Sequence, residues 1–323
     1  MQLDDDKNRN RLINMGIKII GTGSYLPEKV ITNKDLESYL DTSDEWIRER
    51  TGIGNRHVAE KGTETVASLG AEASKRAMEM AGVTADDIDL ILVASCSSQE
   101  HLPCVACQIQ EILGAKKVAA FDINAACSGF MIALSVANAY IETGAFKRAL
   151  VVGSEVLSEL VDWNDRGTCI LFGDGAGAAV VEKGEGSFHY SLGADGTGGK
   201  VLYCNTNEKI QMIGQDVYMF ATKVVPIVIR ETLEKAQLTT DDIDLYILHQ
   251  ANSRIIKTIS RNLKVDIEKF PMNMEKVGNI SSASIPVLLD EINRQGILVS
   301  GKKYLFAGFG AGLTYGACIV DWA

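Results

Sequence analysis

The stretch AGVTADDIDLILVAS at residues 81–95 occurs a second time in this chain, as AQLTTDDIDLYILHQ at residues 236–250. The two copies lie 155 positions apart, and the same offset aligns FKRALVVG at 146–153 with GKKYLFAG at 301–308. Two separate matches at one gap-free offset indicate the duplication of one unit. We therefore predict an α/β protein built from two duplicated halves.

The two halves differ at positions where chemistry could take place. The offset aligns Cys127 with Ser282, and it aligns His249 with Ala94. The two halves are therefore predicted to share one framework. At these positions the cysteine occurs only in the first copy and the histidine only in the second.

We divide the chain into three parts on this basis. Residues 15–182 form an N-terminal half with the candidate cysteine, and residues 183–323 form a C-terminal half with the candidate histidine and asparagine. Residues 1–14, MQLDDDKNRNRLIN, are expected to lie outside the fold, as a disordered extension or a remnant of cloning.

Runs rich in Val, Ile and Leu alternate with helical patterns along the chain. The apolar runs are not interrupted by polar residues, which is typical of strands buried on both faces of a sheet. Strands are predicted at 17–22, 89–96, 119–124, 148–153, 169–181, 244–249, 303–309 and near 315–322. Helices are predicted at 64–81, 105–113, 127–143, 216–236, 252–263 and 283–295. We expect sheets sandwiched between helix layers and a pseudo-twofold axis between the halves.

The composition argues against several classes of function. The net charge of −10 disfavours nucleic-acid binding, which depends on basic surface. No apolar run approaches the roughly 18–20 residues of a membrane-spanning helix, so no membrane partner is expected. Because no secretory signal is apparent, we expect a cytoplasmic protein whose seven cysteines stay reduced. Cys104 and Cys107 have the spacing of half a zinc site, but no second pair accompanies them, so no metal is expected.

Cys127 begins a predicted helix, CSGFMIALSVANAYIETG, that is apolar on almost every side. A helix of this kind lies inside a protein. The N-terminus of a helix favours a thiolate over a thiol, and small neighbouring residues suggest access from a cavity. Cys127 is therefore a candidate nucleophile, and an inert core cysteine is the alternative interpretation.

His249 and Asn279 are the polar candidates of the C-terminal half. His249 follows LYIL and so ends a buried strand, where catalytic groups of open α/β sheets collect. Asn279 lies in VGNISSAS, just ahead of a helix. The alternative interpretation makes His249 a satisfied core residue beside a helix-capping Asn252, and makes Asn279 a capping or turn residue.

Several longer motifs accompany these residues. They are SDEWIRERTGI (43–53), ACSGF (126–130), DRGT (165–168), FGDGAGA (172–178), ADGTGGK (194–200), HQANSRII (249–256), GNISSASIP (278–286) and GFGAGLTYG (308–316). In this order and spacing they resemble the β-ketoacyl-acyl carrier protein synthase III family over almost the whole chain. The resemblance implies a thiolase-like fold, which is a layered αβαβα sandwich, and an acyltransferase that initiates fatty acid biosynthesis.

The chemistry implied by the resemblance is a decarboxylating condensation. Cys127 takes the acyl group of an acyl-CoA primer as a thioester, while the backbone N–H groups of Cys127 and Ala311 hold the oxyanion. Malonyl-acyl carrier protein then loses CO2, and His249 and Asn279 donate hydrogen bonds to the enolate. The carbanion attacks the acyl-Cys127 carbonyl and releases a 3-oxoacyl-acyl carrier protein. No metal or organic cofactor is needed, because release of CO2 drives the reaction.

The resemblance also implies substrate contacts. Trp46 and Arg166 would enclose the adenine of CoA, Arg50 would reach its phosphates, and Asn252 would touch the pantetheine arm. Leu102 stands where a bulky Phe of the partner subunit often lines the acyl pocket. We therefore expect a homodimer whose acyl pocket admits primers of four or five carbons alongside acetyl-CoA.

A basic stripe lies on one predicted helix. Arg254, Lys257, Arg261 and Lys264 share one helix face on an otherwise acidic molecule. Carrier proteins of this pathway are acidic, so the stripe is predicted to dock malonyl-acyl carrier protein. A solvated helix face is the alternative.

Some positions depart from the common pattern of the family. Ala311 interrupts a run that is usually GGG, so the loop is strained if the backbone there needs a positive φ. Ile280 replaces Thr, Tyr315 replaces Trp, and Gln215 and Met219 replace Asn and Lys. The cysteine, the histidine and the asparagine are all retained.

Two other functions stay open. A synthase-III-like condensing enzyme of secondary metabolism, which makes a ketide or quinolone precursor, would carry the same motifs. A cysteine hydrolase or amidotransferase also uses Cys, His and Asn, but this function explains neither the CoA-type motifs nor the duplication.

Overall fold

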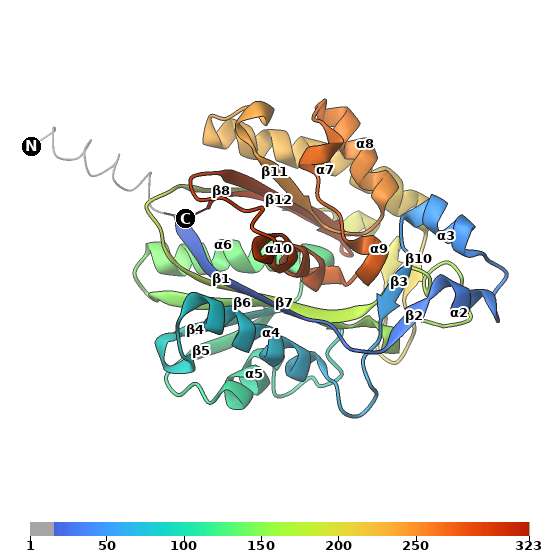
Figure 1. The fold of residues 1–323 in the computed structure, drawn as a ribbon, viewed down its shortest axis with the longest axis horizontal. Coiled ribbons are helices and arrows are strands. Elements are labelled where there is room, and N and C mark those ends of the chain that lie inside the picture. The colour runs from blue at the N-terminus through green and yellow to red at the C-terminus, as the bar shows by residue number, and fades with distance from the viewer. Residues whose placement is uncertain (1–15, 323) are drawn as a thin grey trace, which may run out of the picture.

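The computed structural model describes residues 16–322 of the chain (Figure 1). The predicted extension at residues 1–14 lies outside the described residues. Within residues 16–322, no helix combines the length and the apolar character needed to cross a membrane.

The first sheet of the described chain has five strands, all from the N-terminal half. Their order is β1 (Ile17–Tyr25), β7 (Asp174–Lys183), β6 (Arg148–Val156), β4 (Leu90–Ala94) and β5 (Ala119–Ile123). β4 runs parallel to β5 and β6, whereas β7 runs antiparallel to β6 and β1. Every residue of β4 is buried, which explains its unbroken apolar sequence.

The second sheet of the described chain has four strands. Their order is β11 (Leu245–Leu248), β12 (Lys303–Gly310), β13 (Thr314–Asp321) and β8 (Phe188–Ala194). β11 and β12 are parallel, and the remaining pairs are antiparallel. The order matches the first sheet, with β11, β12, β13 and β8 in the places of β4, β6, β7 and β1.

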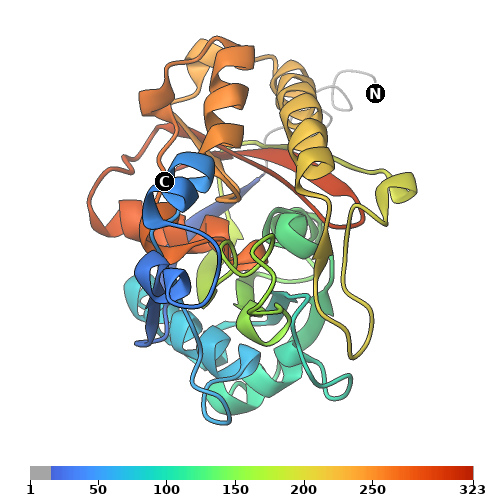
Figure 2. The same ribbon diagram turned by 90° about the vertical axis from the view of Figure 1, so that its right-hand side faces the viewer.

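Helices form three layers around the two sheets (Figures 1 and 2). α6 (Gly129–Glu142) and α10 (Ser284–Arg294) lie between the sheets and share one core cluster with both of them. α4 (Val66–Ala81) and α5 (Val105–Leu113) cover the outer face of the first sheet. α7 (Gly214–Ala236) and α8 (Ser253–Leu263) cover the second. The described chain is therefore the αβαβα sandwich that we expected.

The duplication is visible element by element at the offset of 155 residues. The 3-10 helix η1 (Ala85–Asp87) corresponds to η5 (Thr240–Asp242), and each is preceded by a threonine that forms a capping box. η2 (Ala126–Ser128) corresponds to η7 (Ser281–Ala283), and each leads directly into a central helix. The division of the chain at residue 182 stays a prediction.

Shorter elements gather at one end of the layers, on the right in Figure 1 and toward the viewer in Figure 2. The strands among the shorter elements are β2 (Val30–Thr32), β3 (Asn55–His57), β9 (Leu202–Tyr203) and β10 (Gln211–Met212). The helices are α2 (Asn33–Glu37), α3 (Asp44–Thr51), α9 (Met274–Val277), η3 (Leu157–Glu159), η4 (Gly196–Gly198) and η6 (Ile267–Lys269). The carboxyl ends of the central parallel strands point toward some of these short elements, namely α2, α3, β2, β3 and β10.

Two strand predictions need correction. The strand expected at 169–181 begins only at Asp174, and residues 169–173 form turns. These residues are apolar because they pack in a core cluster and not because they form a strand. Cys169, Ile170 and Phe172 pack in a separate core cluster with residues of α2 and α3. β8 was not predicted, because it is the edge strand of its sheet and only one of its residues is buried.

Candidate active site

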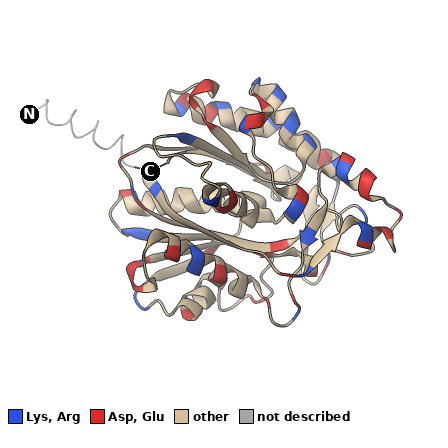
Figure 3. Cartoon of the chain, viewed as in Figure 1, with Lys and Arg blue, Asp and Glu red and all other residues tan. Residues whose placement is uncertain are grey.

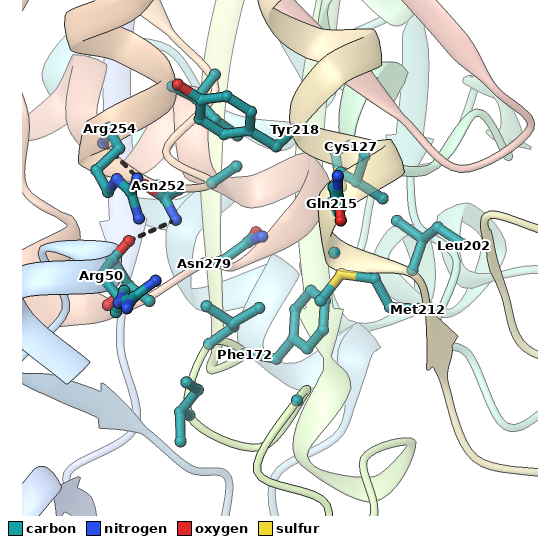
Figure 4. Close-up of a pocket in the computed structure, with 18 of the residues that line it drawn as sticks. Arg50, Cys127, Phe172, Leu202, Met212, Gln215, Tyr218, Asn252, Arg254 and Asn279 are labelled. Atoms are coloured by element: carbon teal, nitrogen blue, oxygen red, sulfur yellow. Dashed lines mark hydrogen bonds between the residues drawn. The ribbon is translucent and has the colours of Figure 1, made fainter. Parts of the chain in front are cut away.

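Eight of the residues selected from the sequence line one pocket of about 740 Å³ (Figure 4). They are Trp46, Arg50, Cys127, Arg166, His249, Asn252, Arg254 and Asn279. The pocket lies between α3, α7 and α8, at the end of the layers where the short elements gather. Residues from both duplicated halves thus meet in one cavity.

Cys127 lies in the turn η2 directly before α6, rather than in the first turn of α6 itself. Its neighbour Ala126 has φ of 47°, a conformation that residues with a side chain seldom adopt. The turn is held by Ser128, whose Oγ donates to Oγ1 of Thr314 at 2.7 Å. Gly310 presses against the turn, since a Cβ there would come within 2.6 Å of the backbone nitrogen of Cys127. Only glycine fits at this approach between the two halves.

The electrostatics of Cys127 differ from the sequence-based expectation of a favoured thiolate. The side chain is only 7% exposed, and burial raises the pKa of the thiol to about 12. A hydrogen bond with Ser281 lowers this pKa, and the negative charge of Glu155 raises it further. The positive end of α6 lies one turn away. Loss of hydration therefore outweighs the helix terminus, and the resting cysteine is a neutral thiol.

His249 follows the last residue of β11 and is 3% exposed. Its backbone N–H donates to Ala307 at 2.9 Å, and its ring packs edge-on against Phe309. Burial lowers the pKa of His249 to about 3, so the ring is neutral near pH 7. Nδ1 is buried without a hydrogen-bond partner in residues 16–322, which favours the tautomer that carries its proton on Nε2.

Asn279 is anchored by its backbone and by one side-chain oxygen. Its N–H donates to Leu171 at 2.9 Å, and its carbonyl accepts from Gly173 at 3.0 Å. Oδ1 accepts from the N–H of Ser281 at 2.9 Å, which is the turn contact that the alternative interpretation foresaw. This contact leaves Nδ2 without a partner among the described residues, while Asn279 lines the pocket. The amide is thus both a turn residue and a free donor.

A second cavity, of about 430 Å³, reaches Cys127 from the other side. Its lining includes Ala311 and is otherwise largely apolar, with Leu157, Leu160, Leu202 and Ile210. Cys127 therefore lies between two cavities. The strain considered for Ala311 is absent, because the residue with positive φ in this loop is Gly312, at 136°.

Trp46, Arg50 and Arg166 form one stack at the mouth of the first pocket. The guanidinium of Arg166 lies 4.9 Å from the centre of the Trp46 ring, and that of Arg50 lies 5.7 Å from it. Arg166 also donates to the backbone oxygen of Asp41. An aromatic ring between Trp46 and Arg166 needs about 7–8 Å between them, at ~3.5–4 Å per contact. The guanidinium must therefore move by a few ångströms to admit a base.

Asn252 is the N-cap of α8, as the alternative interpretation held. Its Oδ1 accepts from the N–H of Arg254 at 2.8 Å, and its Nδ2 donates to the backbone oxygen of Arg50 at 3.1 Å (Figure 4). Since Asn252 also lines the pocket, one side chain joins α8 to α3 at the pocket mouth.

The basic stripe lies on and just after α8. Arg254, Lys257, Arg261 and Lys264 are all exposed, and Lys264 is the residue that caps the helix end. In Figure 3 several segments of the α8 ribbon are blue, the colour of Lys and Arg. Arg254 alone of the four also lines the pocket, so the stripe begins at the pocket mouth.

Leu102 does not line either cavity within the described chain. It is 88% exposed in the loop between β4 and α5, so it is not a core residue of this chain. A role in the acyl pocket therefore requires that Leu102 reach the site of another subunit.

Glu155 is a site residue that we did not select from the sequence. It lies at the end of β6 and is completely buried beside the turns that carry Cys127 and Asn279. A signal for it was present, since a glutamate stands two residues after the predicted buried strand 148–153, in GSEV, and apolar residues follow it.

No group of three or more His, Cys, Asp and Glu side chains in residues 16–322 is arranged to hold a metal ion. All seven cysteines, which lie within this range, are free thiols.

Two family models match this chain. The model of 3-oxoacyl-[acyl-carrier-protein] synthase III matches residues 121–196, and the model of the C-terminal part of these enzymes matches residues 233–322. The matched regions contain Cys127, His249 and Asn279.

Whole-length relatives carry the same description. The β-ketoacyl-[acyl-carrier-protein] synthase III 1 of Bacillus anthracis is 48% identical, over 95% of this chain and 99% of the relative. The crystal structure of 3-oxoacyl-[acyl-carrier-protein] synthase III from Aquifex aeolicus VF5 has a TM-score of 0.92 and 44% identity, over 95% of this chain and 100% of that one. The priming β-ketosynthase of the R1128 polyketide biosynthetic pathway has a TM-score of 0.90 and 37% identity, over 95% and 96%. The predicted fold is confirmed.

Proposed function

This chain belongs to the 3-oxoacyl-[acyl-carrier-protein] synthase III family of acyltransferases, and we propose that Cys127, His249 and Asn279 carry out its condensation of an acyl-CoA primer with malonyl-acyl carrier protein. One observation supports this proposal above the others. The thiol lies between a pocket that also holds the histidine and the asparagine and a second, largely apolar cavity. A substrate entering by the first pocket can thus place its acyl chain in the second.

The first half-reaction transfers the acyl group to Cys127. The sulfur attacks the thioester carbonyl, a new C–S bond forms, and the bond to CoA breaks. CoA leaves as a thiol and takes up the proton released by Cys127. Since burial raises the pKa of this thiol to about 12, loss of the proton must accompany the attack. The backbone N–H groups of Cys127 and Ala311 would stabilise the oxyanion.

The second half-reaction forms the carbon–carbon bond. The malonyl thioester loses CO2, and the electron pair of the broken bond becomes an enolate. Nε2–H of His249 and Nδ2 of Asn279 would donate to the enolate oxygen. Both groups are neutral donors, because burial lowers the pKa of His249 to about 3. The carbanion attacks the acyl carbonyl, and the bond to Cys127 breaks. The sulfur leaves as a thiolate and takes up a proton from water, and the 3-oxoacyl-acyl carrier protein departs.

The residues at the pocket mouth would bind CoA. Trp46 and Arg166 present two flat, stackable surfaces to an adenine, and Arg50 offers a positive charge to a phosphate. Asn252, which also lines the pocket, would meet the pantetheine arm.

The partners and the setting belong to the same proposal. Arg254, Lys257, Arg261 and Lys264 would dock the acidic carrier protein. A second copy of the chain would complete the acyl pocket with Leu102, and the functional unit would be a homodimer. The reaction would need neither a metal nor an organic cofactor. A cytoplasmic location suits a chain with seven free cysteines.

The alternative within the fold is a priming enzyme of secondary metabolism. It is supported by the similarity to the priming β-ketosynthase of the R1128 polyketide pathway. The two functions differ in the acceptor and the primer, so activity with malonyl-acyl carrier protein rather than malonyl-CoA favours the first. A cysteine hydrolase would release free acid from acyl-CoA without any malonyl substrate.

The proposal is tested by intact-protein mass spectrometry after incubation with a panel of acyl-CoAs. We expect one acyl adduct per chain, whose mass identifies the primer, and none in Cys127→Ala. Alanine suits the start of a helix, so this variant should fold. An adduct that persists in Cys127→Ala would refute the assignment.

A further inference from the structure

Glu155 is a completely buried carboxylate that no cation neutralises within the described residues. Buried charges are usually paired, because loss of hydration makes an isolated one costly. A chain that keeps such a carboxylate beside its active site needs the hydrogen bonds that the carboxylate accepts.

Glu155 accepts hydrogen bonds from two separate segments. On one side Oε2 accepts from Oγ of Ser95 at 3.2 Å, from the N–H of Cys96 at 3.1 Å and from Oγ of Ser97 at 2.5 Å. The thiol of Cys96 lies 3.5 Å from Oε1. On the other side Oε1 accepts from Ser282, from Oγ at 2.7 Å and from N at 3.3 Å. The carboxylate therefore joins the loop after β4 to the turn η7.

The turn η7 follows Asn279 by two residues and is strained. Ser281 has φ of 44°, in the left-handed region that residues with a side chain seldom occupy. Such a conformation persists only where surrounding contacts enforce it. The N–H of Ser281 holds Oδ1 of Asn279, and the next residue, Ser282, is held by Glu155. One chain of contacts thus runs from Glu155 to the amide that faces the pocket.

The duplication explains why a carboxylate occupies this place. Ser281 corresponds to Ala126, and the two share a positive φ, at 44° and 47°. At the same offset, Glu155 corresponds to Gly310. Gly310 lies against the turn of Cys127 without a side chain, whereas the side chain of Glu155 bonds Ser282 in the equivalent turn. Of the two turns, only the second is therefore braced by a side chain from this position.

We propose that Glu155 is a positioning residue for the condensation, which holds through Ser282 the strained turn that aims Asn279 into the pocket of Cys127. The proposal rests on the proposed function, because Asn279 matters only for the second half-reaction. It assigns no contact with substrate to Glu155, and it places the main effect on condensation, because Asn279 acts only there.

A second readout follows from charge. The titratable groups that face Glu155 are Cys96, from the loop after β4, and Cys127, from η2. Its negative charge raises the pKa of both thiols. Removal of that charge therefore lowers the pH at which Cys127 reacts with iodoacetamide. Loosened packing that exposes the thiol would act in the same direction, so this measurement supports the split between the half-reactions and does not replace it.

The test compares the wild type with Glu155→Gln, which keeps the size of the side chain and one acceptor oxygen. Acylation is followed by mass spectrometry, and condensation by product formation from the isolated acyl-enzyme with malonyl-acyl carrier protein. We expect acylation within about threefold of wild type and condensation reduced about 100-fold, the usual cost of a misplaced group. The pH profile of Cys127 alkylation should move to lower pH.

Asp290→Asn is the matched control. Asp290 is also a buried carboxylate, but it bonds Thr22, Ser24 and Arg294 between α10 and β1. This variant should lose stability without a split between the half-reactions. If Glu155→Gln does not fold, Ser282→Ala removes only a hydroxyl, with its contacts to Glu155 and to the backbone oxygen of Ala94, and should lower condensation several-fold, with acylation nearly unchanged.

Four results would count against these conclusions. Equal loss of both half-reactions in Glu155→Gln, or unchanged condensation, would overturn the positioning role. Unchanged condensation in Ser282→Ala would do the same where only that variant folds. A wild-type chain that forms no acyl adduct would instead overturn the proposed function.

Discussion

Cys127 and His249 are both neutral in the resting site, and for the same reason. Burial raises the pKa of the thiol to about 12 and lowers the pKa of the imidazole to about 3. A cysteine hydrolase of the Cys–His type works instead with a thiolate whose pKa is lowered by a charged histidine. The neutral histidine is a better match to hydrogen-bond donation than to an ion pair, and this favours the condensing function.

The buried His249 makes stability depend on pH. The pKa of His249 is about 3 in the folded chain and 6.5 ordinarily. Between these pH values the histidine is protonated in the unfolded chain and neutral in the folded chain. Stability is therefore lost as the pH falls from about 6.5 toward 3, by about 2 kcal/mol at pH 5.

Urea unfolding at pH 7.5 and pH 5 measures this loss. His249→Gln should lose less stability than the wild type over this interval, by about the same 2 kcal/mol. The other histidines contribute equally to the change in unfolding free energy of both proteins, so their contributions cancel in the comparison. Identical losses in the two proteins would show that His249 is not buried as a neutral group.

Trp46 offers a test of CoA binding that leaves the chemistry untouched. It lies at the pocket mouth and stacks with Arg166, on α3 rather than near the thiol. Trp46→Ala should raise the KM for acyl-CoA about three- to tenfold, since exposed stacking of this kind contributes about 0.5–1 kcal/mol or somewhat more. Steady-state kinetics should show kcat nearly unchanged. A fall in kcat at constant KM would contradict a role limited to binding.

At the scale of elements, α8 has two proposed roles: it lines the pocket, and it presents basic side chains to the carrier protein. The spacing of the basic residues in the sequence does not separate these roles. The four basic residues share one helix face, as predicted, and all are exposed. Only Arg254 also lines the pocket. Substitution there therefore affects every substrate that enters, whereas Lys257 and Arg261 lie further along the helix and outside the lining.

Charge reversal separates the two tasks. Lys257→Glu should raise the KM for malonyl-acyl carrier protein several-fold and leave acylation by acyl-CoA unchanged, because a docking charge acts on encounter. The effect should shrink as salt is added. Arg254→Glu, in contrast, should impair both half-reactions. Equal damage by Lys257→Glu to acylation would exclude a docking surface on this face.

The elements also show which features a sequence reveals. The repeated motifs predicted β4, β11 and the paired central helices, because buried parallel strands and buried helices need unbroken apolar runs. β8 was not predicted, because an edge strand does not need an unbroken apolar run. The pKa of Cys127 and the contacts of Glu155 were not predicted either, because both depend on segments that only folding brings together. A helix start alone does not report how deeply a thiol is buried.

At the scale of the whole molecule, duplication places the candidate site at the junction of two copies. The turn with Cys127 comes from the first copy, and Asn279 lies just before the equivalent turn of the second. Gly310 of the second copy closely approaches the turn with Cys127. In the proposed dimer, Leu102 would extend this arrangement beyond one chain. It is 88% exposed and lies outside both cavities, so it can shape the acyl pocket only from a partner subunit.

Leu102 is predicted to set the choice of primer across the dimer. Leucine lacks the ring of phenylalanine and leaves more room, and each additional buried methylene contributes about 0.8 kcal/mol. Leu102→Phe should therefore shift kcat/KM toward acetyl-CoA over butyryl-CoA by roughly tenfold. The ratio is the quantity to measure, because a loss of stability lowers both rates together. Sedimentation of both proteins should show a dimer. If the variant sediments as a monomer and keeps the wild-type ratio of kcat/KM for acetyl-CoA and butyryl-CoA, the partner subunit does not contribute to the choice of primer.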